Sequence, residues 1–193
     1  MSLRFDSLTG EAIAPVIDGL AALRIRVFRD WPYLYEGDAA YERNYLQVYR
    51  DNPRAIVAAA FDGPTLVGAA TGLPLVDADA EFQAGFEGQE ISDIFYCAES
   101  VLLPEYRGQG AGHRFFDLRE DHARALGFRR VCFCGVIRPE DHPARPADYR
   151  PLDAFWRRRG YAPLPGVTAR FGWRDIGATE ETEKPMQFWM RTL

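Results

Sequence analysis

The chain has 193 residues, of which 47% are hydrophobic and 13% aromatic, and its formal net charge at pH 7 is -5. A chain of this length and composition can bury one full hydrophobic core but is short for two domains. Residues 1–193 are therefore interpreted as a single domain. The negative balance argues against nucleic-acid binding, which usually requires a basic face or stripe. The N-terminal residues lack a signal peptide's apolar core, and no apolar stretch approaches bilayer length without charge. We therefore expect no membrane contact.

The cysteines restrict the chemistry further. Cys97, Cys132 and Cys134 lie in apolar, strand-like runs. Residues two apart in an extended chain do not easily form a disulfide, and the spacing is not that of a metal site. We therefore expect small core residues, no metal and a reducing, cytoplasmic location.

The spacing of hydrophobic residues predicts helices and strands along the whole chain. The first half contains an edge strand, two helices and a hairpin, at residues 3–8, 16–29, 41–50, 55–61 and 65–73. A polar loop or short irregular helix over 77–90 leads to a strand over 93–103, and a glycine loop then opens into a helix that ends at Gly127. A strand, a proline-rich loop, a short helix and two strands follow, at residues 131–137, 138–150, 152–160, 168–174 and 186–192. This order predicts an α/β fold, with a mixed central β-sheet of six or seven strands and four main helices on both faces.

The glycine loop is the most informative segment and reads RGQGAG over residues 107–112. Positions without side chains let several backbone N–H groups point at one anion, and the helix dipole supports the same negative charge. A Walker A loop would need Lys and Ser or Thr after its last glycine, but His113 and Arg114 follow here. The glycine spacing of a Rossmann fingerprint is also absent. The loop therefore predicts a pyrophosphate site of another kind.

Two motifs resemble the GNAT superfamily of N-acetyltransferases. VLLPEYRGQGAG resembles motif A of that family, with Arg107, Gly110 and Gly112 at the positions of its arginine, its glycine and its glycine or alanine. AFWRRRGYAPL resembles the family's fourth helix and the strand after it, and the element order matches over nearly the whole chain. The resemblance implies a GNAT-like fold, with acetyl-CoA or a related acyl-CoA as the donor.

The resemblance also implies how the donor would bind. The pyrophosphate would lie on the N–H groups of residues 109–112. The pantetheine would lie between the strands of residues 96–103 and 131–137, which splay apart beyond a bulge in the family. An N–H near Leu102 would polarise the thioester carbonyl. The implied donor-binding residues are Val101, Leu102, Leu103, Arg107, Gly108, Gln109, Gly110, Ala111, Gly112 and Trp156.

Glu99 is the predicted proton acceptor. An alkylammonium has a pKa of about 10.4, so a base must free the amine at neutral pH, and similarity to the family places Glu99 on the strand that faces the thioester. The alternative is that Glu99 pairs with an arginine or binds the acceptor. The family often uses a tyrosine to protonate the departing thiolate, but Trp156 holds that position and its indole cannot deliver the proton. Tyr161, Tyr149 or Tyr96 would replace it, or the thiolate leaves without a dedicated acid. Tyr161 is our prediction.

The segment between the first two helices lines the acceptor pocket in the family. Here it reads DWPYLYEGD over residues 30–38, and its aromatic and acidic side chains suit a cation. The predicted acceptor-binding residues are Trp31, Tyr33, Tyr35 and Glu36, with Tyr41 and Tyr45 completing the wall. The alternative is a hydrophobic latch whose acidic groups face water.

The sequence thus predicts acetyl transfer from acetyl-CoA to the amine of a small molecule or amino acid, by direct attack in a ternary complex. A non-catalytic acyl-CoA-binding sensor or interaction module is the main alternative. A protein N-terminal or lysine acetyltransferase is a weaker one. Many similar enzymes are dimers, so a homodimer is compatible with this prediction.

Overall fold

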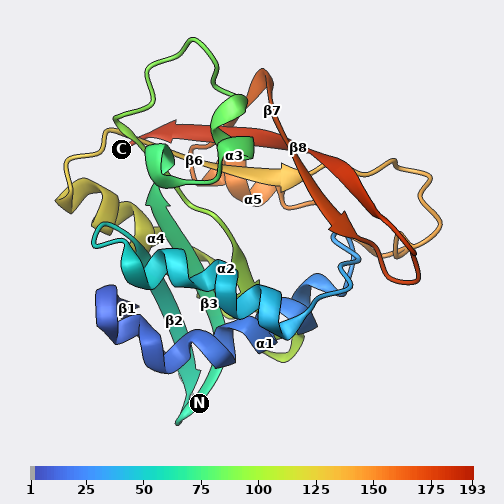
Figure 1. Cartoon of the computed structure of the whole chain (residues 1–193), viewed down its shortest axis with the longest axis horizontal. Coiled ribbons are helices and arrows are strands. Elements are labelled where there is room, and N and C mark those ends of the chain that lie inside the picture. The colour runs from blue at the N-terminus through green and yellow to red at the C-terminus, as the bar shows by residue number, and fades with distance from the viewer. Residues whose placement is uncertain (1–2) are drawn as a thin grey trace.

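One β-sheet organises the computed structural model, which describes residues 3–193 (Figure 1). The strand order is β1-β2-β3-β4-β6-β8-β7, and β5 pairs with β3. Only β4 and β6 run parallel, and every other pair is antiparallel. The strands are β1 (Arg4–Leu8), β2 (Ile56–Asp62), β3 (Thr65–Pro74), β4 (Ile94–Tyr96), β5 (Ser100–Leu102), β6 (Arg130–Val136), β7 (Ala162–Arg174) and β8 (Glu181–Thr192). The helices are α1 (Ile17–Phe28), α2 (Ala39–Asp51), α3 (Ala80–Ala84), α4 (Ala111–Ala125) and α5 (Asp153–Arg158), with 3-10 turns η1 (Gly10–Val16), η2 (Leu75–Asp77) and η3 (Pro104–Tyr106).

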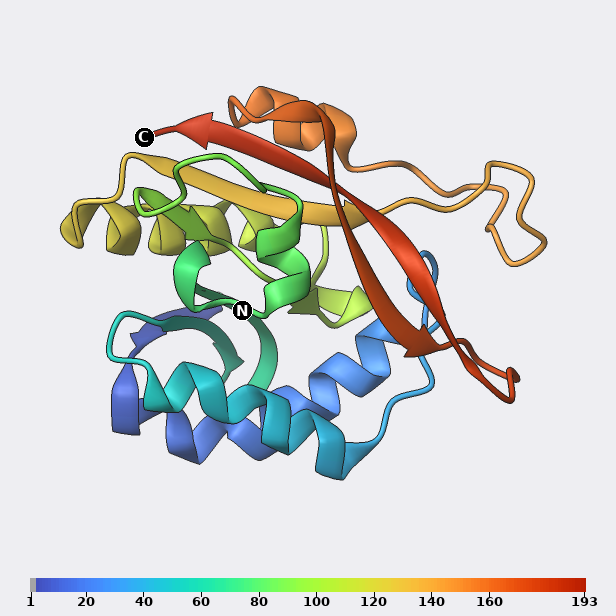
Figure 2. The ribbon, with the colours of Figure 1, turned by 45° about the horizontal axis from the view of Figure 1, so that its top comes forward.

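Helices cover both faces of the sheet. Figures 1 and 2 show α1, α2 and α3 on one face and α4 and α5 on the other. Side chains alternate between the two faces along a strand. In β6, Cys132 and Cys134 join the core on the α1–α3 side, whereas Val131 and Phe133 join the core beneath α4 and α5. All three cysteines are buried and unpaired, which confirms their prediction as small core residues.

The mixed α/β prediction is confirmed, but the sheet has eight strands rather than six or seven. The additional strand arises because the strand predicted over 93–103 is two strands. β4 pairs with both β3 and β6, whereas β5 pairs with β3 alone. The buried Arg119 of α4 binds the chain where β4 ends and β5 begins. Its Nη1 donates to the carbonyls of Thr71 and Glu99, and its Nη2 donates to Ser100 Oγ.

The last two strands are longer than predicted. β7 begins at Ala162 rather than 168, and β8 begins at Glu181 rather than 186. Their pairing shifts register between Pro163 and Thr168, and the hairpin then extends outward as a two-stranded ribbon (Figure 2). The added residues 162–167 and 181–185 are mostly exposed or half-buried and do not alternate between apolar and polar, so their sequence pattern does not predict a strand. Within residues 3–193, none of the helices is long and apolar enough to cross a bilayer.

Candidate active site

The glycine loop presents a row of backbone N–H groups without acceptors. Gly108 and Gly110 have φ values of +76° and +85°, and a Cβ built on either would have no atom within 4 Å. Gly110 is the N-cap of α4 and makes no side-chain cap. Within the described chain, no backbone or side-chain acceptor takes a hydrogen bond from an N–H of residues 108–112. With the α4 dipole behind them, these donors fit a pyrophosphate.

One edge of β5 is left unpaired beside this loop. The carbonyl of Glu99 faces β3, where it accepts from Thr71 N at 3.0 Å. Because bonding direction alternates along an antiparallel strand, the backbone groups of Ser100 and Leu102 face the opposite side, away from β3. That side is open because β6 pairs with β4 and not with β5. The predicted separation of the two strands is therefore confirmed.

Trp156 lies over the far side of this opening. The Trp156 ring packs closely on Gly135 of β6, where an added Cβ would lie 3.2 Å from the indole. The ring also packs on Phe133 and Trp189, with centroid distances of 4.9 and 5.1 Å. Trp156 is thus a packing residue at the edge of the strand opening.

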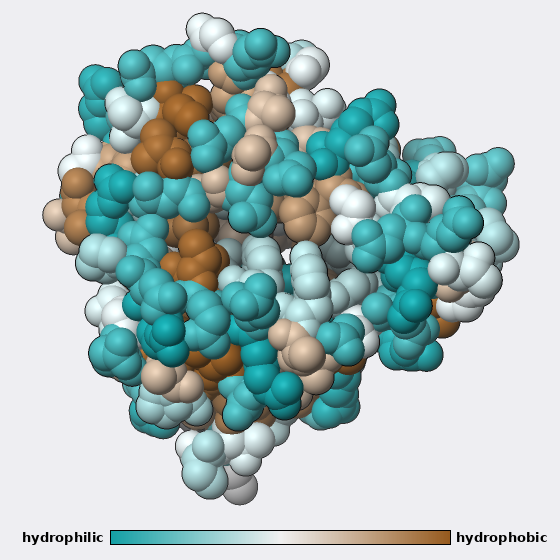
Figure 3. Space-filling view, in the orientation of Figure 1, coloured by the Kyte–Doolittle hydropathy of each residue, from teal (hydrophilic) through white to brown (hydrophobic). Residues whose placement is uncertain are grey.

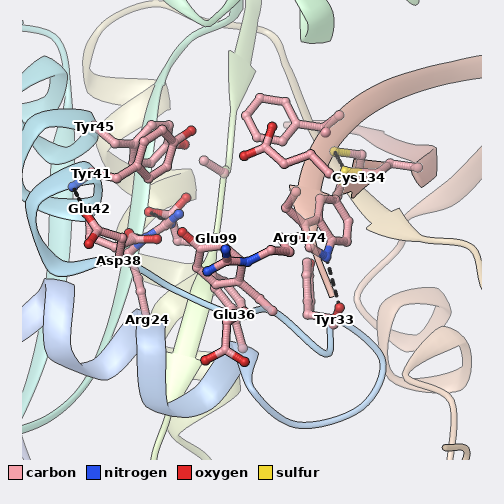
Figure 4. A pocket seen from close by; sticks show the side chains of 18 of the residues that line it. Arg24, Tyr33, Glu36, Asp38, Tyr41, Glu42, Tyr45, Glu99, Cys134 and Arg174 are labelled. Carbon is pink, nitrogen blue, oxygen red and sulfur yellow. Dashed lines mark hydrogen bonds and ion pairs between the residues drawn. The ribbon is translucent and has the colours of Figure 1, made fainter. Parts of the chain in front are cut away.

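A cavity of about 400 Å³ lies on the α1–α2 side of the sheet, between those helices and the β7–β8 hairpin (Figure 4). Nine of its 21 lining residues are aromatic, and five are carboxylates against two arginines. The space-filling view shows pale residues of intermediate hydropathy around a hollow near the centre of this face, framed by hydrophilic ones (Figure 3). Glu99 and Ala98, which join β4 to β5, belong to the lining, so the cavity reaches the point where the strands separate. Its composition favours a cationic ligand with an apolar body.

A buried ion cluster forms the α1–α2 wall of the cavity. Arg24 Nη1 lies 2.5 Å from Glu99 Oε1, and Arg24 Nε donates to Glu42 Oε2. The exposed fractions are 8% for Arg24, 0% for Glu42 and 8% for Glu99. Burial acts to lower the pKa of Arg24, but Glu99 and Glu42 outweigh it and raise that pKa well above its ordinary value. One guanidinium compensates two carboxylates, so the cluster keeps an excess negative charge.

Sequence reasoning missed Arg24 and Glu42, although both carry a signal. Arg24 lies within the buried face of α1, beside Leu20 and Leu23. Glu42 shares the buried face of α2 with Leu46 and Tyr49. A charged residue on each of two adjacent apolar faces indicates a buried pair, because an unpaired charge is rarely buried.

Most of the predicted acceptor residues meet in this cavity. Tyr33, Tyr35, Glu36 and Glu99 all line it. Trp31 does not: its ring packs against His142 and Tyr149, at centroid distances of 5.1 and 5.9 Å. The prediction that Trp31 contacts the acceptor therefore has no support in this geometry, because the indole turns toward the 138–150 loop.

The acceptor segment is fixed by Arg138. Its side chain donates to the carbonyls of Pro32 and Tyr33 and forms a two-oxygen ion pair with Asp175 at 2.9 and 2.8 Å. Trp173 Nε1 donates to the same Tyr33 carbonyl at 3.0 Å. Residues 30–38 are therefore tied to the end of β7, which makes this wall of the cavity rigid.

The tyrosines differ from the prediction. Tyr161 is 2% exposed, lies in the core beneath α4 and α5, and donates to Glu120 Oε1 at 2.9 Å. It lies on the opposite side of the sheet from the cavity, so the predicted acid role of Tyr161 has no geometric support. Tyr96 does line the cavity, where its hydroxyl lies 3.2 Å from Cys134 Sγ. Burial raises the pKa of Tyr96 well above its ordinary value, so the phenol stays protonated.

With the geometry in place, the comparisons with known proteins identify the family. The model of the acetyltransferase (GNAT) family matches residues 21–161, and the chain belongs to that family of acetyltransferases. No match to the chain was found among curated proteins.

Solved structures share the fold at low sequence identity. The chain is similar to a ribosomal-protein-alanine N-acetyltransferase from Brucella melitensis, with 16% identity, a TM-score of 0.62 and 100% of both chains covered. It is similar to an N-acetyltransferase from Staphylococcus aureus Mu50, with 9% identity, a TM-score of 0.62 and coverage of 100% and 99%. A phosphinothricin acetyltransferase from Sinorhizobium meliloti, solved with acetyl-CoA, has 16% identity, a TM-score of 0.62 and coverage of 100% and 89%.

Proposed function

We propose that the protein transfers the acetyl group of acetyl-CoA to the primary amine of a small molecule or amino acid, by direct attack in a ternary complex. One observation carries the proposal: an acidic, aromatic cavity reaches Glu99, where β5 separates from β6 beside the glycine loop. Such a cavity attracts an amine, and the strand opening gives a thioester access to it.

The proposed acetyl-CoA site consists mainly of backbone groups. The N–H groups of residues 108–112 would bind the pyrophosphate, and Arg107 adds an exposed positive charge. The unpaired edge at Ser100 and Leu102 would bind the pantetheine amides. The Leu102 carbonyl accepts from Arg107 Nε at 3.2 Å, while the Leu102 N–H remains directed away from β3 and available to a thioester carbonyl.

An ammonium acceptor loses two protons in the reaction, and sulfur gains one, so one proton is released to solvent. Glu99, directly or through a water, takes the first proton and passes it to solvent, which frees the nitrogen lone pair. The nitrogen then attacks the thioester carbon, the C–S bond breaks, the second nitrogen proton leaves by the same route, and the thiolate takes a proton from solvent. Arg24 holds the Glu99 carboxylate beside the cavity. Tyr96 replaces Tyr161 in our proposal as the hydroxyl that solvates the departing thiolate, since it lines the cavity.

A thiol-release assay with acetyl-CoA and panels of amines, amino acids and peptides tests the proposal. Glu99→Gln is expected to lower kcat at neutral pH by roughly 10²-fold or more, the usual contribution of a general base. The matched control is Glu87→Gln, an exposed carboxylate outside the cavity that loses the same charge.

The alternatives give different results in this assay. Binding of acetyl-CoA without transfer to any panel would indicate the non-catalytic sensor. Faster transfer to peptides than to free amines would indicate a protein acetyltransferase. Full activity of Glu99→Gln across about pH 6 to 9 would refute the base assignment while leaving acetyl transfer in place.

A further inference from the structure

Opposite charges lie on facing walls of the cavity. Glu42 of α2 and Glu99 lie together with Arg24 on one wall. Arg174, the last residue of β7, extends into the cavity from the opposite wall (Figure 4). Glu36 and Glu181 line the cavity beside Arg174, and Glu181 is its cross-strand neighbour, so this side holds a cation among carboxylates.

The carboxylates of the α1–α2 wall are not fully compensated by Arg24. Glu42 Oε1 is buried and accepts no hydrogen bond, although the side chain lines the cavity, whereas Glu99 Oε1 is held in the ion pair with Arg24. Buried carboxylate oxygens normally have donors, and Arg24 alone compensates the two charges. An ammonium group supplies both the missing donor and the missing positive charge.

The guanidinium of Arg174, an exposed residue, has unused hydrogen-bond donors. Within residues 3–193, no carboxylate lies within 4.0 Å of the Arg174 guanidinium, and this side chain makes no hydrogen bond, while its backbone carbonyl accepts from Glu36 N at 2.9 Å. Arg24 and Arg138, by contrast, are each paired with carboxylates. A guanidinium fork with available donors matches a carboxylate in two-point geometry.

We propose that the acceptor is an amino acid, with its ammonium on the Glu42 and Glu99 side and its carboxylate on Arg174. The aromatic lining would surround the rest of the molecule, and a cavity of about 400 Å³ suits a ligand of that size. This inference rests on the proposed acetyl transfer and selects among its acceptors. It excludes protein N-termini, since their first residue carries an amide in place of the carboxylate.

The test compares each amino acid with its amide and its decarboxylated amine, for example phenylalanine, phenylalanine amide and phenethylamine. The wild-type protein is expected to acetylate the best amino acid with a kcat/KM at least about tenfold above that of its amide. Arg174→Gln is expected to lower kcat/KM for the amino acid roughly ten- to hundredfold, the usual effect of a hydrogen bond between charged groups, and to change the amide little. Arg170→Gln is the control, an exposed β7 arginine outside the cavity lining that loses the same charge.

Three results would overturn the inference. They are equal activity on acid and amide, an equal loss on both in Arg174→Gln, and a preference for diamines, which would mean that the carboxylates select a second cation. Absence of transfer to every amine would refute the proposed function instead. Calorimetric titration of the same amino acid and amide into the CoA-loaded protein and its Arg174→Gln variant then still tests the carboxylate contact.

Discussion

Arg24 Nη1 lies 2.5 Å from Glu99 Oε1, so the residue predicted as the proton acceptor is also half of a buried ion pair. The same guanidinium binds Glu42, so three charged groups, from α1, α2 and the segment that joins β4 to β5, form one cavity wall. The alternative that Glu99 pairs with an arginine is therefore what the structure shows, while its role as the base stays a prediction.

Arg24→Met is expected to destabilise the protein strongly. It leaves two buried carboxylates without a cation, and removing one partner of a buried ion pair costs about 3–5 kcal/mol. Urea unfolding measures the change in the free energy of unfolding. The control is Arg26→Met, on the same helix but exposed and 3.7 Å from Glu105, where about 1 kcal/mol or less is expected. A loss in Arg24→Met no larger than the control's would show that Arg24 is not required to compensate these charges.

Gly110→Ala is expected to weaken acetyl-CoA binding. Gly110 has φ +85°, a conformation that costs an L-residue roughly 1–2 kcal/mol, and it directs the loop N–H groups. Gly127, just beyond the other end of α4, has φ +84° and equal space around a Cβ. Gly127→Ala should therefore lose similar stability but keep its affinity, measured by calorimetry with acetyl-CoA. Equal affinity losses in the two variants would refute a donor site at this loop.

The sequence predicted the elements that depend on local pattern. The glycine spacing of residues 107–112 and the continuous apolar runs of β2, β3 and β6 lie in consecutive residues, and the structure confirms those elements. The break between β4 and β5 could not be predicted in this way. It depends on Arg119, whose guanidinium bonds carbonyls 48 and 20 residues away in the chain.

The lining of the cavity could also be predicted only in part from the sequence. Tyr33, Tyr35 and Glu36 were predicted because they are neighbours in one segment, whereas the opposite wall comes from the β7–β8 hairpin. Arg174 reaches the cavity only through that ribbon's twist and its tether to residues 30–38. A position that depends on tertiary packing leaves no periodic pattern in a single sequence, so it could not be predicted there.

The cysteines are expected to stay unreactive in the native protein. Burial raises the pKa of Cys97 to about 11 and that of Cys134 to about 12. At about pH 8 a disulfide reagent such as dithionitrobenzoate should react slowly with native protein and with all three thiols after unfolding in guanidinium. Rapid native labelling would contradict this burial.

The same thiols should make stability fall at alkaline pH. Unfolded thiols ionise near pH 8.5, while the native ones hold their protons, so the native state binds more protons above that pH. Their stabilising contribution is complete below about pH 8.5 and is lost as the pH rises toward 11 and 12. Urea unfolding at several alkaline pH values measures the slope. The matched control is Cys97→Ala, for which a shallower decrease is expected, and an unchanged slope would assign the effect to other groups.

Tyr161→Phe and Tyr96→Phe together decide which tyrosine serves the reaction. Tyr161 donates to Glu120, a buried carboxylate that Arg159 and Arg191 also bind, so its hydroxyl should contribute about 1–3 kcal/mol to stability and nothing to kcat. The Tyr96 side chain lines the cavity, and loss of its hydroxyl is expected to lower kcat roughly tenfold or more, the usual effect of a hydrogen bond to a charged group. Initial rates of CoA release, measured with urea unfolding of the same preparations, separate the two effects. A kcat that falls in Tyr161→Phe and is unchanged in Tyr96→Phe would return the role to Tyr161. Unchanged kcat in both would mean that the thiolate leaves without a tyrosine.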